Sequence, residues 1–238
     1  GLNLGQKLPD SPERIQRELV LQLAVGFALT VVKGRAAPEV ERTYTRMREL
    51  CERRGETPEL FPALLGLWIV YLWRAELRTA YDLVEQLLRR GQSAHDPALL
   101  TYAQMARGAT SYWMGEFLAA REHLDNAITL YDPERHRRLA FRGGAWVDPR
   151  LPCLLYAALT LWHLGYPDQA LKRGNEALAL AQPVSHSFSL GFVGLFASFL
   201  RQYRREARTA QETAESVIAL SAEHGLTDYL AFAISVCG

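Results

Sequence analysis

Apolar residues recur along most of this chain at intervals of three and four positions, with polar residues between them. This spacing places the apolar side chains on one face of an α-helix. Ala, Leu, Glu, Arg and Gln are abundant, and these residues favour helix. No stretch alternates apolar and polar positions with β-branched side chains, so we expect no strands. The pattern predicts an all-α protein.

Glycine, proline and acidic residues divide the apolar stretches into about eleven helices. Several predicted helices begin with proline and an acidic residue, as at Pro12-Glu13 and Pro38-Glu39. Such residues suit the free N–H groups of a first turn. The predicted helices cover residues 12–32, 37–54, 58–74, 77–91, 97–114, 117–131, 149–164, 167–182, 185–203, 206–224 and 227–237.

An internal repeat relates these helices in pairs. Ala80, Ala120, Ala170 and Ala210 each lie early in a second helix, at separations of 40, 50 and 40 residues, and a further step of 40 reaches Val40. Three other columns keep the same spacing: Met47, Leu87, Ala127, Ala177 and Val217; Ala28, Trp68, Gly108, Ala158 and Ser198; and, at the turn, Arg35, Ala75, Gly115, Gly165 and Arg205. Small residues let two helices approach closely, and one pair cannot bury its own apolar face. We therefore expect a right-handed superhelical solenoid of about five and a half stacked pairs.

Two of the repeats resemble a known family in detail. The matching positions are Gly108, Gly115, Ala120, Ala127 and Pro133 in one repeat, and Ala158, Gly165, Ala170, Ala177 and Pro183 in the next. They are similar to the tetratricopeptide (TPR) pattern. The repeat is longer than the usual ~34 residues, which resembles the MalT-like variant of the family. The first and last pairs depart from the pattern, because both have arginine at the turn.

Three segments resemble a particular bacterial group: residues 8–14, residues 131–133 followed by His136-Arg137, and residues 164–171. They are similar to the repeat region that lies C-terminal to a signal-transduction ATPase, often with a nucleotide cyclase or kinase domain upstream. The resemblance implies a non-catalytic interaction or regulatory module. Such a module binds a peptide, a partner protein or another domain of its own chain.

The charge, the cysteines and the apolar stretches limit which partners and which cellular compartment we expect. The 238 residues carry 27 basic and 26 acidic side chains, a net charge of +1, so we expect neither nucleic acid nor a membrane surface as partner. The cysteines, Cys51, Cys153 and Cys237, are far apart and odd in number, which argues against a disulfide framework or zinc site and for the cytoplasm. The longest apolar stretch, Leu60–Trp73, is shorter than the ~20 residues of a membrane span and predicts a buried core helix.

The chain is expected to form one repeat domain over residues 1–238. It lacks an initiator Met and ends in an apolar helix, so we expect it to be a piece of a longer multidomain protein. Homo-oligomer formation stays open.

Known catalytic and metal-binding motifs are missing from the sequence. There is no phosphate-binding loop, no His-Glu-x-x-His, no Gly-x-Ser-x-Gly and no calcium-loop spacing. The six histidines are scattered. Cys153 and His163 would lie about 15 Å apart along one helix, too far for a nucleophile and its base. We expect no catalytic residue, no metal and no cofactor, and so no enzyme activity in this chain.

The 50-residue step between Ala120 and Ala170 carries an insertion of about ten residues, near residues 132–149, and insertions in repeat arrays often carry function. Its candidate recognition residues are Tyr131, His136, Arg137, Arg138, Arg142 and Trp146. Arginine forks can grip carboxylate or phosphate groups. Two interpretations stay open: the insertion binds an anionic group, or it packs on the solenoid through Leu139, Phe141 and Trp146. Binding would suit a small-ligand sensor, the alternative to a protein-interaction module.

Replacing Arg137, Arg138 and Arg142 with Gln separates these interpretations. If the insertion recognises an anionic group, the variant keeps its melting temperature and loses coupling to the rest of its parent protein. A lowered melting temperature, or no change in either measurement, would assign the insertion to packing or to no role.

Overall fold

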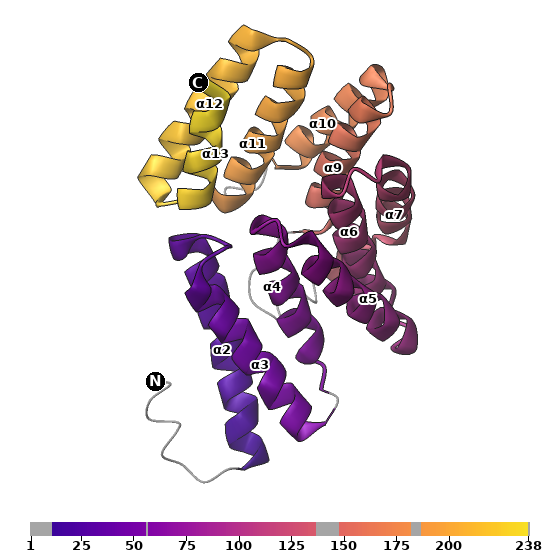
Figure 1. The fold of residues 1–238 in the computed structure, drawn as a ribbon, viewed down its shortest axis with the longest axis vertical. Coiled ribbons are helices and arrows are strands. Elements are labelled where there is room, and N and C mark those ends of the chain that lie inside the picture. Colours follow the sequence, from indigo (N-terminus) through magenta and orange to yellow (C-terminus); the bar gives the residue numbers. More distant parts are fainter. Residues whose placement is uncertain (1–10, 56, 137–147, 182–186, 238) are drawn as a thin grey trace.

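The computed structural model describes residues 11–55, 57–136, 148–181 and 187–237, and the described residues form helices and no strand (Figure 1). The helices are α2 (Pro12–Lys33), α3 (Pro38–Arg54), α4 (Leu60–Trp73), α5 (Leu77–Ser93), α6 (Pro97–Trp113), α7 (Phe117–Leu130), α9 (Arg150–His163), α10 (Pro167–Ala181), α11 (Ser187–Tyr203), α12 (Ala207–His224) and α13 (Thr227–Cys237). Each lies within two residues of its predicted range at either end. The all-α prediction is confirmed.

Consecutive helices pack as antiparallel pairs, and each pair packs on the next. The pairs are α2/α3, α4/α5, α6/α7, α9/α10 and α11/α12, and α13 begins a sixth. The array curls so strongly that α13 also contacts α2, the first helix described. Figure 1 shows the yellow C-terminal helices beside one end of indigo α2. The curl turns the first helices of successive pairs towards a common interior.

The repeat columns coincide with the contacts between helices. Val40, Ala80, Ala120, Ala170 and Ala210 are all buried, as are Met47, Leu87, Ala127, Ala177 and Val217. At Gly108 an added Cβ would lie only 2.5 Å from a carbon of Leu124, so no larger residue fits there. The columns therefore mark real close contacts between helices.

The turn column has a shared backbone conformation in four of the five pairs. Ala75, Gly115, Gly165 and Arg205 have φ of 58°, 79°, 84° and 59°, in the left-handed region. Glycine adopts this region without strain, and other residues do so at some cost. The common conformation explains why the connections between the paired helices keep the same length in these four pairs.

The first pair differs from the prediction. Its connection spans residues 34–37, one residue more than residues 74–76 in the second pair, and Gly34 has the positive φ of 91° in place of Arg35. The extra residue shifts α2 out of register with the other first helices. Ala28, assigned to the small-residue column, is consequently exposed. Gly26 makes the close contact, since an added Cβ would lie 2.8 Å from Cζ of Tyr44.

The expected insertion loop is partly helical. Residues 133–136 form a helical turn after Asp132, whose carboxylate accepts hydrogen bonds from the N–H groups of Glu134 and Arg135 at 2.9 and 3.3 Å. An aspartate that accepts from the second and third residues beyond it is a helix N-cap. The insertion predicted near residues 132–149 therefore begins with a helical turn.

The two most apolar helices near the N-terminus have different environments. α4 is buried on most of its surface, as predicted for a core helix. α2 is long and apolar enough by composition to cross a membrane, with a mean hydropathy of 1.5 over 18 residues, of which 28% are buried. Core helices of soluble proteins meet the same criterion. One such helix is weak evidence for a membrane span, and α2 packs along α3.

The close contact at Ala170 gives a test of the register. Ala170→Leu inserts three carbons where the side chain is fully buried, and overpacking of this kind costs about 1–3 kcal/mol. We expect a melting temperature several degrees below wild type. Ala179→Leu, at an exposed position of the same helix, is the control and should change the melting temperature little. Equal melting temperatures for the two variants would contradict the register.

Candidate functional site

The interior of the superhelix holds a pocket that draws on five successive first helices. We call it the inner pocket, and its cavity measures about 110 Å³. Its lining residues are Leu23, Phe27 and Thr30 of α2, Arg35, Tyr44 of α3, Leu65, Gly66, Trp68, Ile69, Leu72 and Trp73 of α4, Tyr102 and Met105 of α6, Pro152 and Tyr156 of α9, and Phe188 and Phe192 of α11. No single repeat could form this pocket, because its walls meet only after the chain has curled.

Most of the lining is apolar or aromatic, and its polar atoms are largely engaged with the protein. The indole N–H of Trp68 donates to the hydroxyl of Thr110 at 2.9 Å, and the hydroxyl of Thr30 donates to the carbonyl of Gly26 at 2.8 Å. Burial raises the pKa of Tyr44 and of Tyr156 to about 12, so both remain neutral phenols at physiological pH. The pocket therefore presents uncharged surface over most of its wall.

Among the described residues that line the pocket, Arg35 is the one arginine or lysine, and its charge is balanced. Its side chain is 7% exposed. The guanidinium lies 3.2 Å from a carboxylate oxygen of Asp228 and donates a hydrogen bond to the hydroxyl of Tyr229. The backbone N–H of Arg35 donates to the same Asp228 oxygen at 2.7 Å. We call these three residues the Arg35 clasp; it joins the α2–α3 turn to α13.

Aromatic rings complete the surroundings of the guanidinium. Its central carbon lies 4.4 Å from the ring centroid of Trp73, 4.6 Å from Phe188, 4.7 Å from Tyr229 and 5.8 Å from Phe192. A cation over a desolvated ring gains up to about 2 kcal/mol. Burial raises the pKa of Tyr229 to about 12, although the adjacent Arg35 acts to lower it, so Tyr229 stays a neutral partner.

Gly34 allows the clasp to close. Its φ of 91° is strained for any other residue, and an added Cβ would overlap the carboxylate of Asp228. The glycine thus serves two purposes, because it turns the chain after α2 and leaves space for the counter-charge of Arg35.

A second apolar cavity adjoins the inner pocket. We call it the outer groove; it measures about 240 Å³ and shares Leu72 and Trp73 with the inner pocket. Trp73 lies between Arg35 on one side and Phe232 on the other, with 5.3 Å between the Trp73 and Phe232 ring centroids. Trp113 and Phe232, which also line the outer groove, are 46% and 39% exposed.

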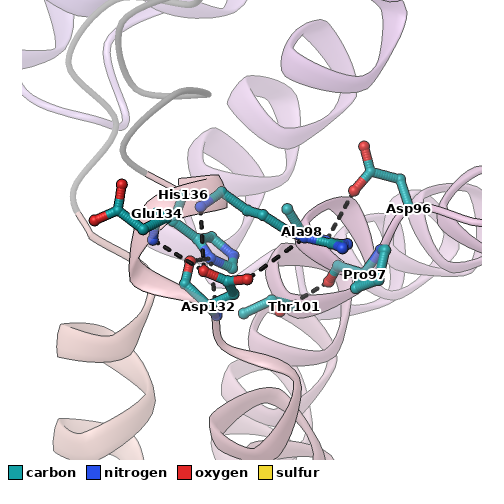
Figure 2. A network of polar contacts seen from close by, with 8 residues as sticks. Asp96, Pro97, Ala98, Thr101, Asp132, Glu134 and His136 are labelled. Carbon is teal, nitrogen blue, oxygen red and sulfur yellow. Dashed lines mark hydrogen bonds and ion pairs between the residues drawn. The ribbon is translucent and has the colours of Figure 1, made fainter.

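The predicted recognition residues that the structure describes form a small separate cluster. Tyr131 stacks on His136 with 4.7 Å between centroids, and its hydroxyl donates to Asp148 at 2.6 Å. His136 is buried, and its Nδ1 lies 2.6 Å from the carbonyl oxygen of Asp132 and 3.3 Å from the backbone nitrogen of the same residue. Figure 2 shows this turn beside the first turn of α6. The ring of His136 also contacts Tyr102, at 5.7 Å between centroids, which connects the cluster to the inner pocket.

The other four predicted recognition residues, Arg137, Arg138, Arg142 and Trp146, lie outside the described residues. Their assignment to an anion site stays a prediction. Tyr131 and His136 are held by protein groups, and the Nε2 atom of His136 is buried without a hydrogen-bond partner among the described residues.

Metal-ligating side chains are dispersed over the described part of the chain. No three His, Cys, Asp or Glu side chains gather there as metal ligands. Burial raises the pKa of the Cys153 thiol far above its usual range, so it is protonated at neutral pH and a poor nucleophile. His163 stacks on Phe117 at 4.5 Å and lies in an aromatic cluster.

The inner pocket was not identified from the sequence. In the sequence, Arg35 stands in a turn column where three of the other four repeats have alanine or glycine. The counter-charge at Asp228 is 193 positions away, and no pattern of spacing could have paired the two.

The fold is shared with known repeat proteins. No protein-family profile matches the chain, and no curated protein matches its sequence. The nearly identical TPR-like repeats of a kinesin light chain from Podosopora anserina are similar in structure, with a TM-score of 0.52 and 16% identity over 86% of this chain and 95% of that one. A Rap protein in complex with Competence and Sporulation Factor gives a TM-score of 0.37 and 14% identity over 92% and 70%. The first match places this chain among TPR-like solenoids, as the repeat columns predicted.

Gly34→Ala should be more destabilising than the same change at Gly115. Both glycines have positive φ, but a Cβ on Gly115 would meet nothing within 4 Å, whereas one on Gly34 would meet Asp228. Strain at such φ values alone costs on the order of 1 kcal/mol. We expect Gly34→Ala to lower the free energy of unfolding by about 1–3 kcal/mol more, measured by denaturant titration. Equal losses would show that Asp228 does not crowd Gly34 in solution.

Proposed function

We propose that this chain is a non-catalytic protein-interaction module whose inner pocket receives an apolar side chain from a peptide or partner protein. The proposal extends to a regulatory role in the cytoplasm, within a bacterial multidomain signalling protein that has MalT-like TPR repeats. The partner is a free peptide, a second protein or another domain of the same chain.

The inner pocket carries this proposal. Repeat solenoids bind partners on the extended concave surface that their curvature creates. Here that surface narrows to a cavity lined by residues from α2, α4, α6, α9 and α11 together. A pocket shared by five repeats depends on the curvature of the whole array.

The charges around the pocket define what fits. Arg35 is already paired with Asp228, so a carboxylate would have to displace that partner, and a cation would face Arg35. A neutral aliphatic or aromatic group needs neither change. Apolar cavities of about 150 Å³ take up benzene, so ~110 Å³ suits one apolar side chain. The anionic ligand predicted from the insertion does not suit the inner pocket.

A small-ligand sensor is the second candidate. The observation that favours it is the enclosure of the inner pocket by aromatic side chains on several sides, which suits a small neutral molecule as well as a side chain. The charge balance supports neither nucleic acid nor a membrane surface as partner for either candidate.

Filling the inner pocket tests the proposal. Ile69→Trp places a larger side chain at a lining position, and Leu118→Trp adds the same bulk at a position that is 76% exposed. Random peptides displayed on phage are selected on the wild-type protein. We expect the enriched peptides to share an apolar anchor residue. They should bind Ile69→Trp at least about tenfold more weakly than wild type, which is ~1.4 kcal/mol. They should bind Leu118→Trp with the same affinity as wild type.

A parallel screen with uncharged aromatic fragments separates the two candidates. If fragments bind wild type but not Ile69→Trp, and no peptide is enriched, the result would favour the small-ligand sensor over the interaction module. Peptides that bind wild type and Ile69→Trp equally would contradict the use of the inner pocket.

A further inference from the structure

Three contacts close the superhelix by joining its two ends. The first is the Arg35 clasp. The second is an edge contact between Phe27 of α2 and Phe188 of α11, at 6.1 Å between centroids. The third is the contact between Trp73 and Phe232. All three join the first two pairs to α11 and α13.

The residues that close the superhelix also enclose the inner pocket. Phe27, Arg35, Trp73, Phe188 and Phe192 all line it, and Arg35 touches the other aromatic wall residues Trp73, Phe188 and Phe192. Separation of α11 and α13 from the first two pairs would uncover the pocket on the side of Phe188 and Phe192. The same contacts therefore control both the closure of the superhelix and access to the pocket.

A second feature lies between the C-terminal helices and the middle of the array. A hollow of about 200 Å³ lies between α9, α10 and α11, lined by apolar residues such as Leu155, Leu178 and Phe196 and by polar residues such as Asn175, Arg201 and Arg204. An added Cβ on Gly174 would lie 3.0 Å from a carbon of Leu200, so the space does not extend to this position. Cavities leave their lining atoms without contacts on one side. The contact of α11 with α9 and α10, which we call the α10–α11 seam, is thus incompletely packed. On their other side, the C-terminal helices are held by the Arg35 clasp.

We propose that the Arg35 clasp is a gate for the inner pocket. In the closed state the clasp holds residues 187–237 against the first two pairs. When the clasp opens, these helices turn about the α10–α11 seam and expose the pocket. This gate goes beyond the proposed function, because it holds for a peptide, a domain or a small molecule alike.

A distance measurement across the gate tests the proposal. Spin labels are placed on Arg42→Cys, at an exposed position of α3, and on the exposed Cys237 of α13; Cys51 and Cys153 are buried. Electron–electron double resonance then gives the distance between labels. We expect Arg35→Met and Asp228→Ala to broaden this distribution and shift it to longer distances. Arg107→Met is the control, since it removes a 3.0 Å hydrogen bond to Tyr81 between α6 and α5, away from the gate.

Access to the pocket is measured with the uncharged dye Nile red. We expect its fluorescence to rise several-fold with either clasp variant and to stay at the wild-type level with Arg107→Met. It should fall back when Ile69→Trp is added to a clasp variant. Folding of each variant is followed by circular dichroism. If Arg35→Met does not fold, the distance and dye measurements on Asp228→Ala test the gate.

Three results would overturn the gate. The first is a wild-type distance distribution in a folded clasp variant. The second is dye binding in a clasp variant equal to that of the Arg107→Met control. The third is loss of the folded state in both clasp variants, because a gate must leave the remaining solenoid folded when it opens. Failure to find any peptide or fragment partner would leave these results unaffected, so the two proposals fail independently.

Discussion

The guanidinium of Arg35 is almost completely buried, and a buried charge is tolerated only with a counter-charge and hydrogen bonds. Both come from α13, through Asp228 and Tyr229. The first turn and the last helix must therefore meet, which fixes the end of the superhelical curl. The inner pocket follows from the same requirement, because the rings that shield the guanidinium are also its wall. Removal of one partner from a buried ion pair typically costs about 3–5 kcal/mol, so this contact is a large part of the stability of closure.

The rest of the solenoid supplies the curvature that makes this meeting geometrically feasible. Alanines at the pair contacts and left-handed residues at the turns set nearly the same geometry in each of four repeats. Small residues bring the helices of a pair together, while the aromatic side chains of the first helices face inward. A repeat array distributes stability among neighbouring contacts. The clasp differs because it couples repeats that are far apart in sequence, and such a long-range contact can respond to an occupant between them.

The sequence predicted what local spacing determines. Helix positions, pairing and the columns at Ala80, Ala120, Ala170 and Ala210 follow from the 40-residue period, and the structure confirms them. The first pair was misplaced because one extra residue in its turn shifts Ala28 to the surface, and a fixed period cannot detect one inserted residue. The inner pocket could not be predicted from local spacing. Its walls come together through the sum of the small rotations between successive helix pairs from Phe27 to Phe188. The insertion near residues 132–149 is visible in the sequence because it changes the length of one repeat. Arg35 changes only the residue type at one position, which is a much weaker signal.

The most direct test of this account is a double-mutant cycle between Arg35 and Asp228. The free energy of unfolding is measured by denaturant titration for wild type, Arg35→Met, Asp228→Ala and the double variant. Residues that do not touch give additive losses within about 0.3–0.5 kcal/mol, and residues in one ion pair give coupling of about 0.5–3 kcal/mol. The account predicts a favourable coupling of at least ~1 kcal/mol between residues 193 positions apart. Additive losses would show that the two ends of the solenoid do not meet in solution, and would contradict both the clasp and the closed inner pocket.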